Sequence, residues 1–438
     1  MRTRQAGLYL LAKNHALAAA GIPALPGAGH EATLAGWGPA LAGAVFFALS
    51  LGLGWGTLFG LWGLCWSSAR GLLRRLGPWI ALAVPGWAGV RGDGALAGAL
   101  AACALGAVGI AAAGSRRPSS LLRRGLLVGL VGLGLVPWAR APEGPFTRLR
   151  DRYLLTHPPG IALDTLYYRW TLYPAEALKP LAAKSQPTAA PAPALPPTRY
   201  ERFCDEASRL GVVCLPRPGA GADLTVALRG ETIRLAAAGG ATGWPDGDLP
   251  GQREAWAELS RQTDPARPLR RATAAALFLG VPLALCWALA TWADRLSRAL
   301  PGPKARRAGA AACAALVAGL LALTAVPNPD LTATRRRWAE AEQERLALAG
   351  KLLLSPNAAL RFHAARLARQ LGPAAAPLLL DGLTDPVINV RYAAAESLGA
   401  VGAPQVRDVL LRVLESPEEW YVKERAYGAL RRLGWRPR

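Results

Sequence analysis

Long apolar runs without a charged residue alternate with short clusters of arginine, first between residues 40 and 139 and again after residue 272. A run of about 20 apolar residues is long enough to cross a lipid bilayer as a helix. Six runs are candidate spans, and two of them are short: 40–66, 78–90, 95–114, 126–139, 273–292 and 308–327. The pattern therefore predicts a mainly α protein whose largest part is a polytopic transmembrane helix bundle.

Basic residues in the short loops predict the orientation of these spans. The loops 67–77, 115–125 and 293–307 contain twelve lysine and arginine residues, whereas the loop 91–94 contains one. Loops rich in lysine and arginine stay cytoplasmic. We therefore expect a multi-pass protein of a bacterial plasma (inner) membrane with extracytoplasmic soluble domains. Arginines also flank the long segment 140–272, so a cytoplasmic position of these domains remains an alternative.

Changes in composition divide the chain into seven parts. The predicted parts are an N-terminal tail (1–39), transmembrane helices 1–4 (40–139), an aromatic interfacial helical segment (140–183), a Pro/Ala linker (184–199), a small α+β insert (200–272), transmembrane helices 5–6 (273–327), and a linking helix with helical repeats (328–438). Tyr167, Tyr168, Trp170 and Tyr173 suit a helix at the level of the lipid headgroups. A packing cluster for the soluble insert is the alternative.

The insert contains two cysteines ten residues apart. A helix is predicted from Thr198 to Leu210, with Gly211 as its stop, and two short strands are predicted on either side of Arg229 and Gly230. Cys204 lies on this helix and Cys214 lies just beyond it. In an oxidising compartment the two would form a disulfide that pins the helix end to the next strand. Two buried free thiols in a cytosolic domain are the alternative.

The last ninety residues contain an internal repeat. With an offset of 30, "LRFHAARLARQLG" (360–372) aligns with "VRYAAAESLGAVG" (390–402), and an offset of 32 adds "VKERAYGALRRLG" (422–434). Each unit has an apolar–basic pair, small alanines and a closing glycine, and each follows a turn that contains proline. Single helix pairs cannot bury their apolar faces, so repetition predicts a stacked helical solenoid.

This pattern resembles the short HEAT repeats of the phycobilin-lyase type. The resemblance covers about residues 350–438. It implies an α-solenoid that binds protein partners, because most members of that family are protein-binding scaffolds and only a few are lyases. The candidate partner contacts are Arg361, Arg391, Tyr392, Trp420, Tyr421 and Lys423. The three basic residues among them could instead form a structural ladder with Asp385 or Glu418. The complete expected fold class is a transmembrane helix bundle with a small α+β insert and a C-terminal HEAT-like solenoid.

The net charge and the absence of known motifs exclude several classes of function. The net charge of +22 comes without any base-reading module, so we expect no nucleic-acid partner. No catalytic constellation, metal cluster or cofactor motif is apparent, which indicates a protein that is not an enzyme and needs no cofactor. The expected contacts are a protein partner, membrane lipid, and a second copy of the chain through glycine-rich spans, where Gly52, Gly56 and Gly60 repeat at four-residue spacing.

The leading hypothesis is a membrane-anchored scaffold or adaptor that works in an envelope complex. The alternative is a channel or transporter subunit with the solenoid as its regulatory domain. None of the six predicted spans contains a charged residue or a histidine. Ion-coupled transport usually needs such groups within the bilayer, and this favours the scaffold.

Overall fold

A computed structural model describes residues 2–67, 176–264, 266–280 and 329–437, apart from 28 and 220, with short pieces at 101, 151, 154–155, 163–168, 283–284, 288 and 302. Two compact units divide the chain. Unit 1 comprises Met1–Gly43, Arg150–Asp264 and Pro327–Arg438, and unit 2 comprises Ala44–Leu149 and Pro265–Val326. The candidate site lies in unit 1.

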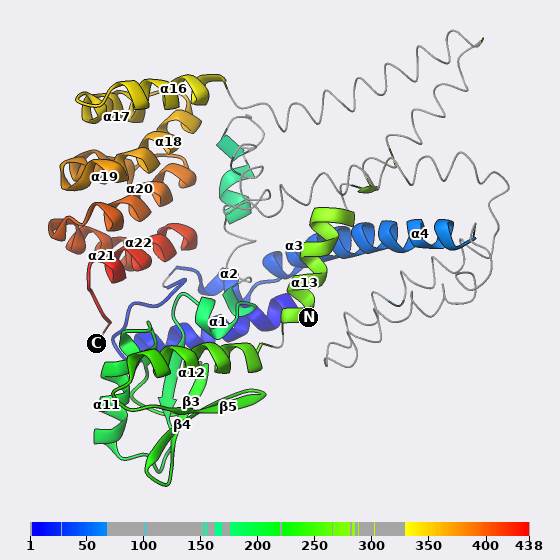
Figure 1. The fold of residues 1–438 in the computed structure, drawn as a ribbon, viewed down its shortest axis with the longest axis vertical. Coiled ribbons are helices and arrows are strands. Elements are labelled where there is room, and N and C mark those ends of the chain that lie inside the picture. The colour runs from blue at the N-terminus through cyan, green and yellow to red at the C-terminus, as the bar shows by residue number, and fades with distance from the viewer. Residues whose placement is uncertain are drawn as a thin grey trace. The chain divides into compact units, whose positions relative to one another are not determined.

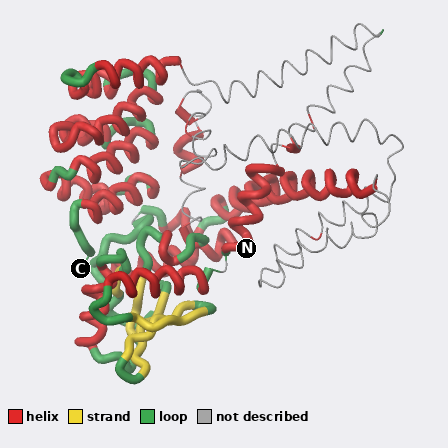
Figure 2. The backbone as a smooth tube through the Cα atoms, in the orientation of Figure 1, coloured by secondary structure: helices red, strands yellow, loops and turns green. Residues whose placement is uncertain are grey.

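A five-stranded mixed sheet forms one part of unit 1 (Figure 2). Its strands are β1 (Thr188–Pro191), β2 (Val213–Cys214), β3 (Leu224–Arg229), β4 (Thr232–Ala237) and β5 (Gly240–Trp244), in the spatial order β2-β1-β3-β4-β5. β1 pairs in parallel with β2 and β3, and the pairs β3–β4 and β4–β5 are antiparallel. The two strands predicted around Gly230 are therefore confirmed.

Helices cover the sheet unevenly. α11 (Pro197–Ser208) and α12 (Leu249–Gln262) bury Phe203 and Leu259 against Val226, Ile233 and Leu235. The residues that alternate with these on β3 and β4 are exposed or half-buried, as expected for a sheet with one wet face. β1 differs, because α1 (Arg2–Ala19) covers its other side. A short 3-10 turn, η2 (Leu181–Ala183), leads into β1.

Residues 184–199 are not simply a linker. Their first half contains β1, whose residues Thr188, Ala189 and Ala190 are at most 3% exposed. Alanine and proline are poor strand formers in isolation. The small side chains of β1 instead allow α1 and the helices of the insert to pack closely on its two sides.

Helix pairs stacked on one another form the C-terminal part of unit 1 (Figure 1). α16 (Pro329–Glu340) precedes the first pair, α17 (Arg345–Leu353) with α18 (Ala358–Ala368). The 3-10 segment η4 (Arg369–Ala375) leads to the second pair, α19 (Ala376–Gly382) with α20 (Ile388–Val401). The turn η5 (Pro404–Val406) leads to the third, α21 (Arg407–Glu415) with α22 (Trp420–Arg432). α18, α20 and α22 contact one another in sequence.

The closing glycines of the repeats have backbone conformations that favour glycine. Gly372, Gly402 and Gly434 all have positive φ, between 64° and 78°. Gly402 is in the left-handed helical region that commonly ends a helix, whereas Gly372 has an extended ψ of −157°, and glycine adopts both conformations without the steric cost of a Cβ. The alanines between them, such as Ala364, Ala394 and Ala395, are fully buried and let neighbouring helices approach closely.

The N-terminal helices lead into unit 2. α2 (Glu31–Ala35) follows α1, and α3 (Gly38–Phe47), the π-helical segment η1 (Ala48–Leu53) and α4 (Gly54–Ser67) continue the chain. Within unit 2, α4 crosses the π-helical segment η3 (Ala276–Gly280), which continues α13 (Arg267–Ala275). A Cβ on Gly54 would lie 2.6 Å from that of Ala276, so this crossing requires glycine.

The expected fold class is wrong. Among the described residues, one helical stretch, Gly38–Gly60, is long and apolar enough to cross a membrane. The described architecture is a mainly helical chain with a five-stranded mixed sheet and C-terminal repeats, without the predicted polytopic bundle. The prediction counted every long uncharged run as a membrane span, although length and lack of charge alone do not establish a span. The other predicted spans lie wholly or mostly outside the described residues: 78–90, 95–114, 126–139, 273–292 and 308–327.

Candidate docking site on the helical repeats

A ladder of ion pairs connects successive repeats. The guanidinium of Arg361 donates from Nε to Asp385 Oδ2 (2.6 Å) and from Nη2 to Oδ1 (3.1 Å). Its Nη1 donates to the carbonyl oxygen of Ser355 in the preceding turn (2.9 Å). Arg391 repeats the arrangement with Glu418 (Nη2–Oε1 3.0 Å) and the carbonyl oxygen of Asp385 (2.8 Å). These two arginines therefore fix each repeat to the next, as the structural reading of the sequence predicted.

Lys423, the third basic position, breaks the series. Its side chain is fully buried, and Nζ has no hydrogen-bond partner among the described residues. The loop before α2 lies over it, because a Cβ on Gly27 would be 3.2 Å from Nζ. Burial lowers the pKa of the Lys423 ammonium, and the carboxylates of Glu418 and Glu31 offset this only in part. The loop covers the position where a further repeat would stack.

An aromatic row runs along the inner helices of the solenoid. Phe362 on α18 meets Tyr392 on α20 edge to face, with ring centroids 5.7 Å apart, and Tyr392 meets Tyr421 on α22 at 4.8 Å. All three rings are at most 8% exposed. Edge-to-face pairs of this kind stabilise a fold by about 0.5–1.5 kcal/mol beyond their buried area. The row therefore packs successive repeats together.

A segment of the same chain covers this row. We call the described residues 151, 154–155, 163–168 and 176–179 the covering segment. The ring of Tyr168 stacks on Tyr421 at 5.3 Å and meets Tyr392 at 6.3 Å. Tyr168 is fully buried, and Leu154 and Leu155 are each 4% exposed. The headgroup position expected for Tyr168 is thus replaced by packing on the solenoid, whereas Trp170 and Tyr173 lie outside the described residues.

Two carboxylates of the covering segment bind the start of α20. Asp151 accepts hydrogen bonds from Asn389 Nδ2 (3.2 Å) and from the hydroxyl of Tyr392 (3.3 Å). Asp164 accepts one from the backbone amide of Ile388, the first residue of α20 (3.3 Å). The first amides of a helix have no partner within the helix, and the helix dipole favours a negative charge there. The inner face of the solenoid thus binds acidic groups at one defined position.

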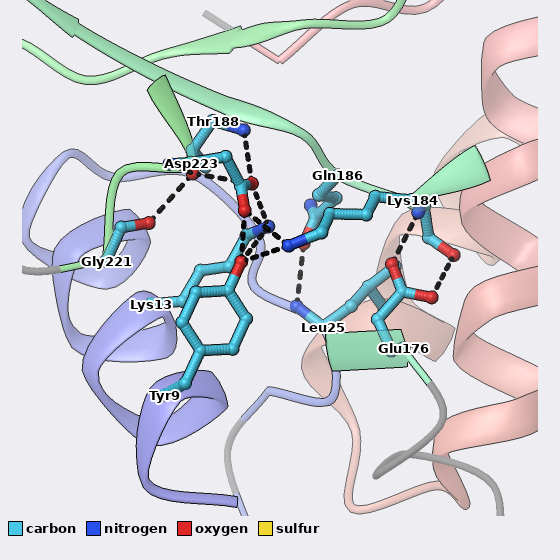
Figure 3. A network of polar contacts seen from close by, with 10 residues as sticks. Tyr9, Lys13, Leu25, Glu176, Lys184, Gln186, Thr188, Gly221 and Asp223 are labelled. Atoms are coloured by element: carbon cyan, nitrogen blue, oxygen red, sulfur yellow. Dashed lines mark hydrogen bonds and ion pairs between the residues drawn. The ribbon is translucent and has the colours of Figure 1, made fainter. Parts of the chain in front are cut away.

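A buried polar network holds α1 to the sheet (Figure 3). The carboxylate of Asp223 accepts from Lys13 Nζ (2.7 Å), Lys184 Nζ (2.5 Å) and the amide of Thr188 (2.9 Å), and also from the hydroxyl of Tyr9. The side chains of Lys13 and Asp223 are each 2% exposed. Charge-assisted hydrogen bonds from several donors offset the cost of burying these charges.

The electrostatics of this network follow from burial and pairing. Burial alone would raise the pKa of the Asp223 carboxyl, but the two ammonium groups outweigh it and hold the pKa well below its usual range. Burial lowers the pKa of Lys13 despite the attraction of Asp223, and burial with the nearby carboxylate raises the pKa of the Tyr9 hydroxyl. Asp223 therefore stays ionised at neutral pH.

A second polar group connects the covering segment to α22. Lys179 Nζ lies 2.6 Å from Glu176 Oε2 and 3.0 Å from Glu424 Oε1. Burial would lower the pKa of Lys179, but Glu424 and Glu176 raise it above its usual value. The hydroxyl of Ser185 donates to Glu424 (2.7 Å), and its amide donates to Glu176 (2.5 Å). The solenoid is thus tied to the chain that leads into β1.

The structure places the predicted site residues in two classes. Arg361 and Arg391 form the ladder, whereas Tyr392, Trp420, Tyr421 and Lys423 are buried, two of them directly under the covering segment. A disulfide joins Cys204 on α11 to Cys214 in β2. Among the described residues, no group of three or more His, Cys, Asp or Glu is placed to hold a metal ion.

Sequence reasoning missed Asp151, Asp164 and Asn389. Nothing in their local sequence indicates pairing across more than 220 positions. The one usable signal was an asparagine at a position of α20 that its repeat partners fill with alanine and tyrosine, Ala359 and Tyr421. A buried polar side chain on an apolar helix face needs a hydrogen-bond partner.

Comparison with known proteins agrees with this geometry over part of the chain. A family model described as HEAT repeats matches residues 346–431, which is the stretch from α17 to α22. No curated protein and no solved structure matches the chain. HEAT repeats generally mediate protein–protein interaction and are generally not catalytic. Residues 346–431 thus carry a HEAT-repeat solenoid of the kind that serves protein interaction or scaffolding.

Proposed function

We propose that this chain is a membrane-anchored scaffold or adaptor whose HEAT-like solenoid binds a protein partner in an envelope complex. The observation that carries the proposal is the set of three stacked helix pairs with their ion-pair ladder, in the stretch that matches HEAT repeats. Stacked repeats present an extended surface built on a rigid frame. Such a surface suits recognition of another polypeptide.

One helix supports the membrane anchor. The stretch Gly38–Gly60 has a mean hydropathy of 1.7, and 12% of its most apolar window is buried within the protein. Leu41, Val45 and Leu53 on it are each at least 47% exposed. A long apolar helix with large exposed side chains is expected to be covered by lipid or by another protein. Lipid is the cover that we propose.

The disulfide supports an extracytoplasmic position for the sheet of unit 1. Disulfides persist in oxidising compartments such as the bacterial periplasm and are rare in the cytosol. Cys204 and Cys214 are bonded in this structure. We therefore place the soluble part of the protein on the outer side of a bacterial plasma membrane. Thiol labelling of intact cells, with and without reductant, tests this: the two cysteines should react only after reduction.

Site-specific photocrosslinking in the full chain tests the docking function. A photoreactive amino acid replaces Leu354 or Arg412, which are exposed on the solenoid, and the matched control replaces Thr225, which is exposed on the wet face of the sheet. Both solenoid positions should crosslink the same protein in cells, and Thr225 should not. Identical products from all three positions, or none from the solenoid, would refute the proposal.

A further inference from the structure

The inner face of the solenoid is already occupied by part of its own chain. The covering segment contributes two carboxylates, one tyrosine ring and two leucines to this face. The side chains of Tyr392, Tyr421 and Asn389 beneath it are each at most 8% exposed. Inner faces of helical repeats are concave surfaces that commonly bind partners. A surface proposed for docking is therefore closed in this structure.

We infer that the inner face is a receptor for a peptide segment that presents two carboxylates and an aromatic ring, and that the covering segment is its resident ligand, displaced when a partner protein presents a segment with the same three groups. The inference rests on the proposed docking function, and it names the chemistry of the partner. Three contacts define that chemistry, and each has a separate physical cause.

The first contact is a carboxylate on the N-terminus of α20. Asp164 accepts from the amide of Ile388, where the helix dipole is positive. The second is a carboxylate in a polar niche, since Asp151 accepts from both Asn389 and Tyr392. An uncharged amide in place of either carboxylate would lose its charge-assisted bond. A phosphate group would be larger than the carboxylate that the niche holds.

The third contact is an aromatic ring between two aromatic rings. Tyr168 stacks on Tyr421 with an interplanar angle of 26° and meets Tyr392 at 61°. Large aromatic anchors in buried pockets contribute most of the affinity at many interfaces. The partner segment therefore needs two carboxylates followed, toward its C-terminus, by an aromatic ring. This is the order of Asp151, Asp164 and Tyr168 along the chain.

Tethering explains why a free ligand would bind the intact protein weakly. A tethered ligand acts at an effective concentration of the order of 1 mM. If the free peptide has a Kd of about 10 µM for the open receptor, the effective concentration is about 100 times this Kd, and the tethered copy closes about 99% of the sites. Weakening the tethered ligand without changing the receptor should then increase the apparent affinity for the free peptide by up to about 100-fold. A true partner must offer more contacts than the resident segment, or arrive at a high local concentration.

The experiment uses the full chain and a fluorescent peptide of the sequence 149–169, "LRDRYLLTHPPGIALDTLYYR". The released protein carries Asp151→Ala and Tyr168→Ala, which change only the resident ligand. Fluorescence anisotropy should show that the released protein binds the peptide at least tenfold more tightly than the unaltered protein. A peptide with alanine at the positions of Asp151, Asp164 and Tyr168 should bind at least tenfold more weakly, and so should a released protein that also carries Asn389→Leu.

Equal affinity for the two peptides, or no difference between released and unaltered protein, would overturn the inference. If the released protein does not fold, Asp151→Asn with Tyr168→Leu, which removes the ring but fills part of its volume, takes its place and is judged in the same way. Loss of folding in both would show that the segment is a permanent part of the core, which also overturns the inference. The crosslinking from Leu354 and Arg412 is independent of these results, so the docking function can stand when this inference fails.

Discussion

The solenoid and the sheet of unit 1 are stabilised by opposite strategies. In the solenoid, each rung of the ladder joins residues 24 to 27 positions apart, and the aromatic row joins neighbouring repeats. In the sheet, each connection occurs only once: Asp223 binds Lys13, which is 210 positions away, and one disulfide joins Cys204 on α11 to Cys214 in β2. Local pairs can be lost one at a time, whereas the sheet depends on a few connections that nothing nearby can replace.

The largest expected effect is at the centre of the sheet's network. Asp223→Ala would leave Lys13 and Lys184 buried without their carboxylate, and removing one partner of a buried ion pair costs about 3–5 kcal/mol. Chemical denaturation of the full chain measures it, with Asp205→Ala on the exposed side of α11 as control. Equal midpoints for the two variants would contradict the contrast between sheet and solenoid.

The pH dependence of this effect has a defined sign. The folded pKa of Asp223 lies below its unfolded value, so the carboxylate contributes its full stability above the unfolded pKa of about 3.9. The contribution is lost as pH falls from there toward the folded pKa. The difference in stability between the unaltered protein and Asp223→Ala should therefore be constant near neutral pH and shrink below about pH 4.

The disulfide should have the next largest effect. Replacing Cys204 and Cys214 together by serine removes a bridge that closes a short loop, at an expected cost of about 2–4 kcal/mol. The midpoint of thermal unfolding should fall in the double variant and in the reduced protein by similar amounts. A double variant as stable as the oxidised protein would show that the sheet does not rely on this bridge.

A single rung of the ladder should contribute less. Arg391→Met removes the ion pair with Glu418, in which both side chains are under 20% exposed, and about 1–2 kcal/mol is expected for a charged hydrogen bond. Arg412→Met on the exposed face of α21 is the matched control and should change stability by less than about 0.5 kcal/mol. A loss above 4 kcal/mol would make the solenoid as dependent on one contact as the sheet.

Substitution of Lys423, where a third rung of the ladder would lie, should have the smallest effect on stability, and it should stabilise the protein rather than destabilise it. Lys423→Met removes a buried amine without a described partner and keeps most of its volume, so a gain of about 1 kcal/mol at pH 7 is expected. Because the folded pKa of Lys423 is lowered, the unfolded chain binds more protons between that pKa and about 10.4. The stability of the unaltered protein should therefore rise with pH in this range relative to the variant. Destabilisation by Lys423→Met would reveal a favourable contact of the amine.

These two regions also explain what sequence reasoning could reach. The repeats were predictable because Arg361, Arg391 and Lys423 recur at one position of a helix pair, and the ladder contacts join residues that are close in the sequence. β3 and β4 were predictable because they form a hairpin. β1 was not, because its strand conformation comes from pairing with residues 213–214 and 224–226 and from burial under α1.

The site was predictable only in part. The ladder follows from the repeat register, but the covering segment does not, since Tyr168 suits a lipid headgroup layer and a tyrosine stack equally well. The polytopic bundle was predicted from apolar length and lack of charge alone, and neither property establishes that a run crosses a membrane.

The position of α1 has a consequence for synthesis of the chain. Lys13 and Leu17 leave the ribosome about two hundred residues before Asp223, Val213 and Leu215, the groups that bury them. Throughout that interval the first helix can pack against α2, but its amine and the side chains that face the sheet have no partner. Closing so long a loop is slow, and an unprotected apolar helix invites aggregation. The first helix can therefore complete its buried contacts only after residue 223 has been made.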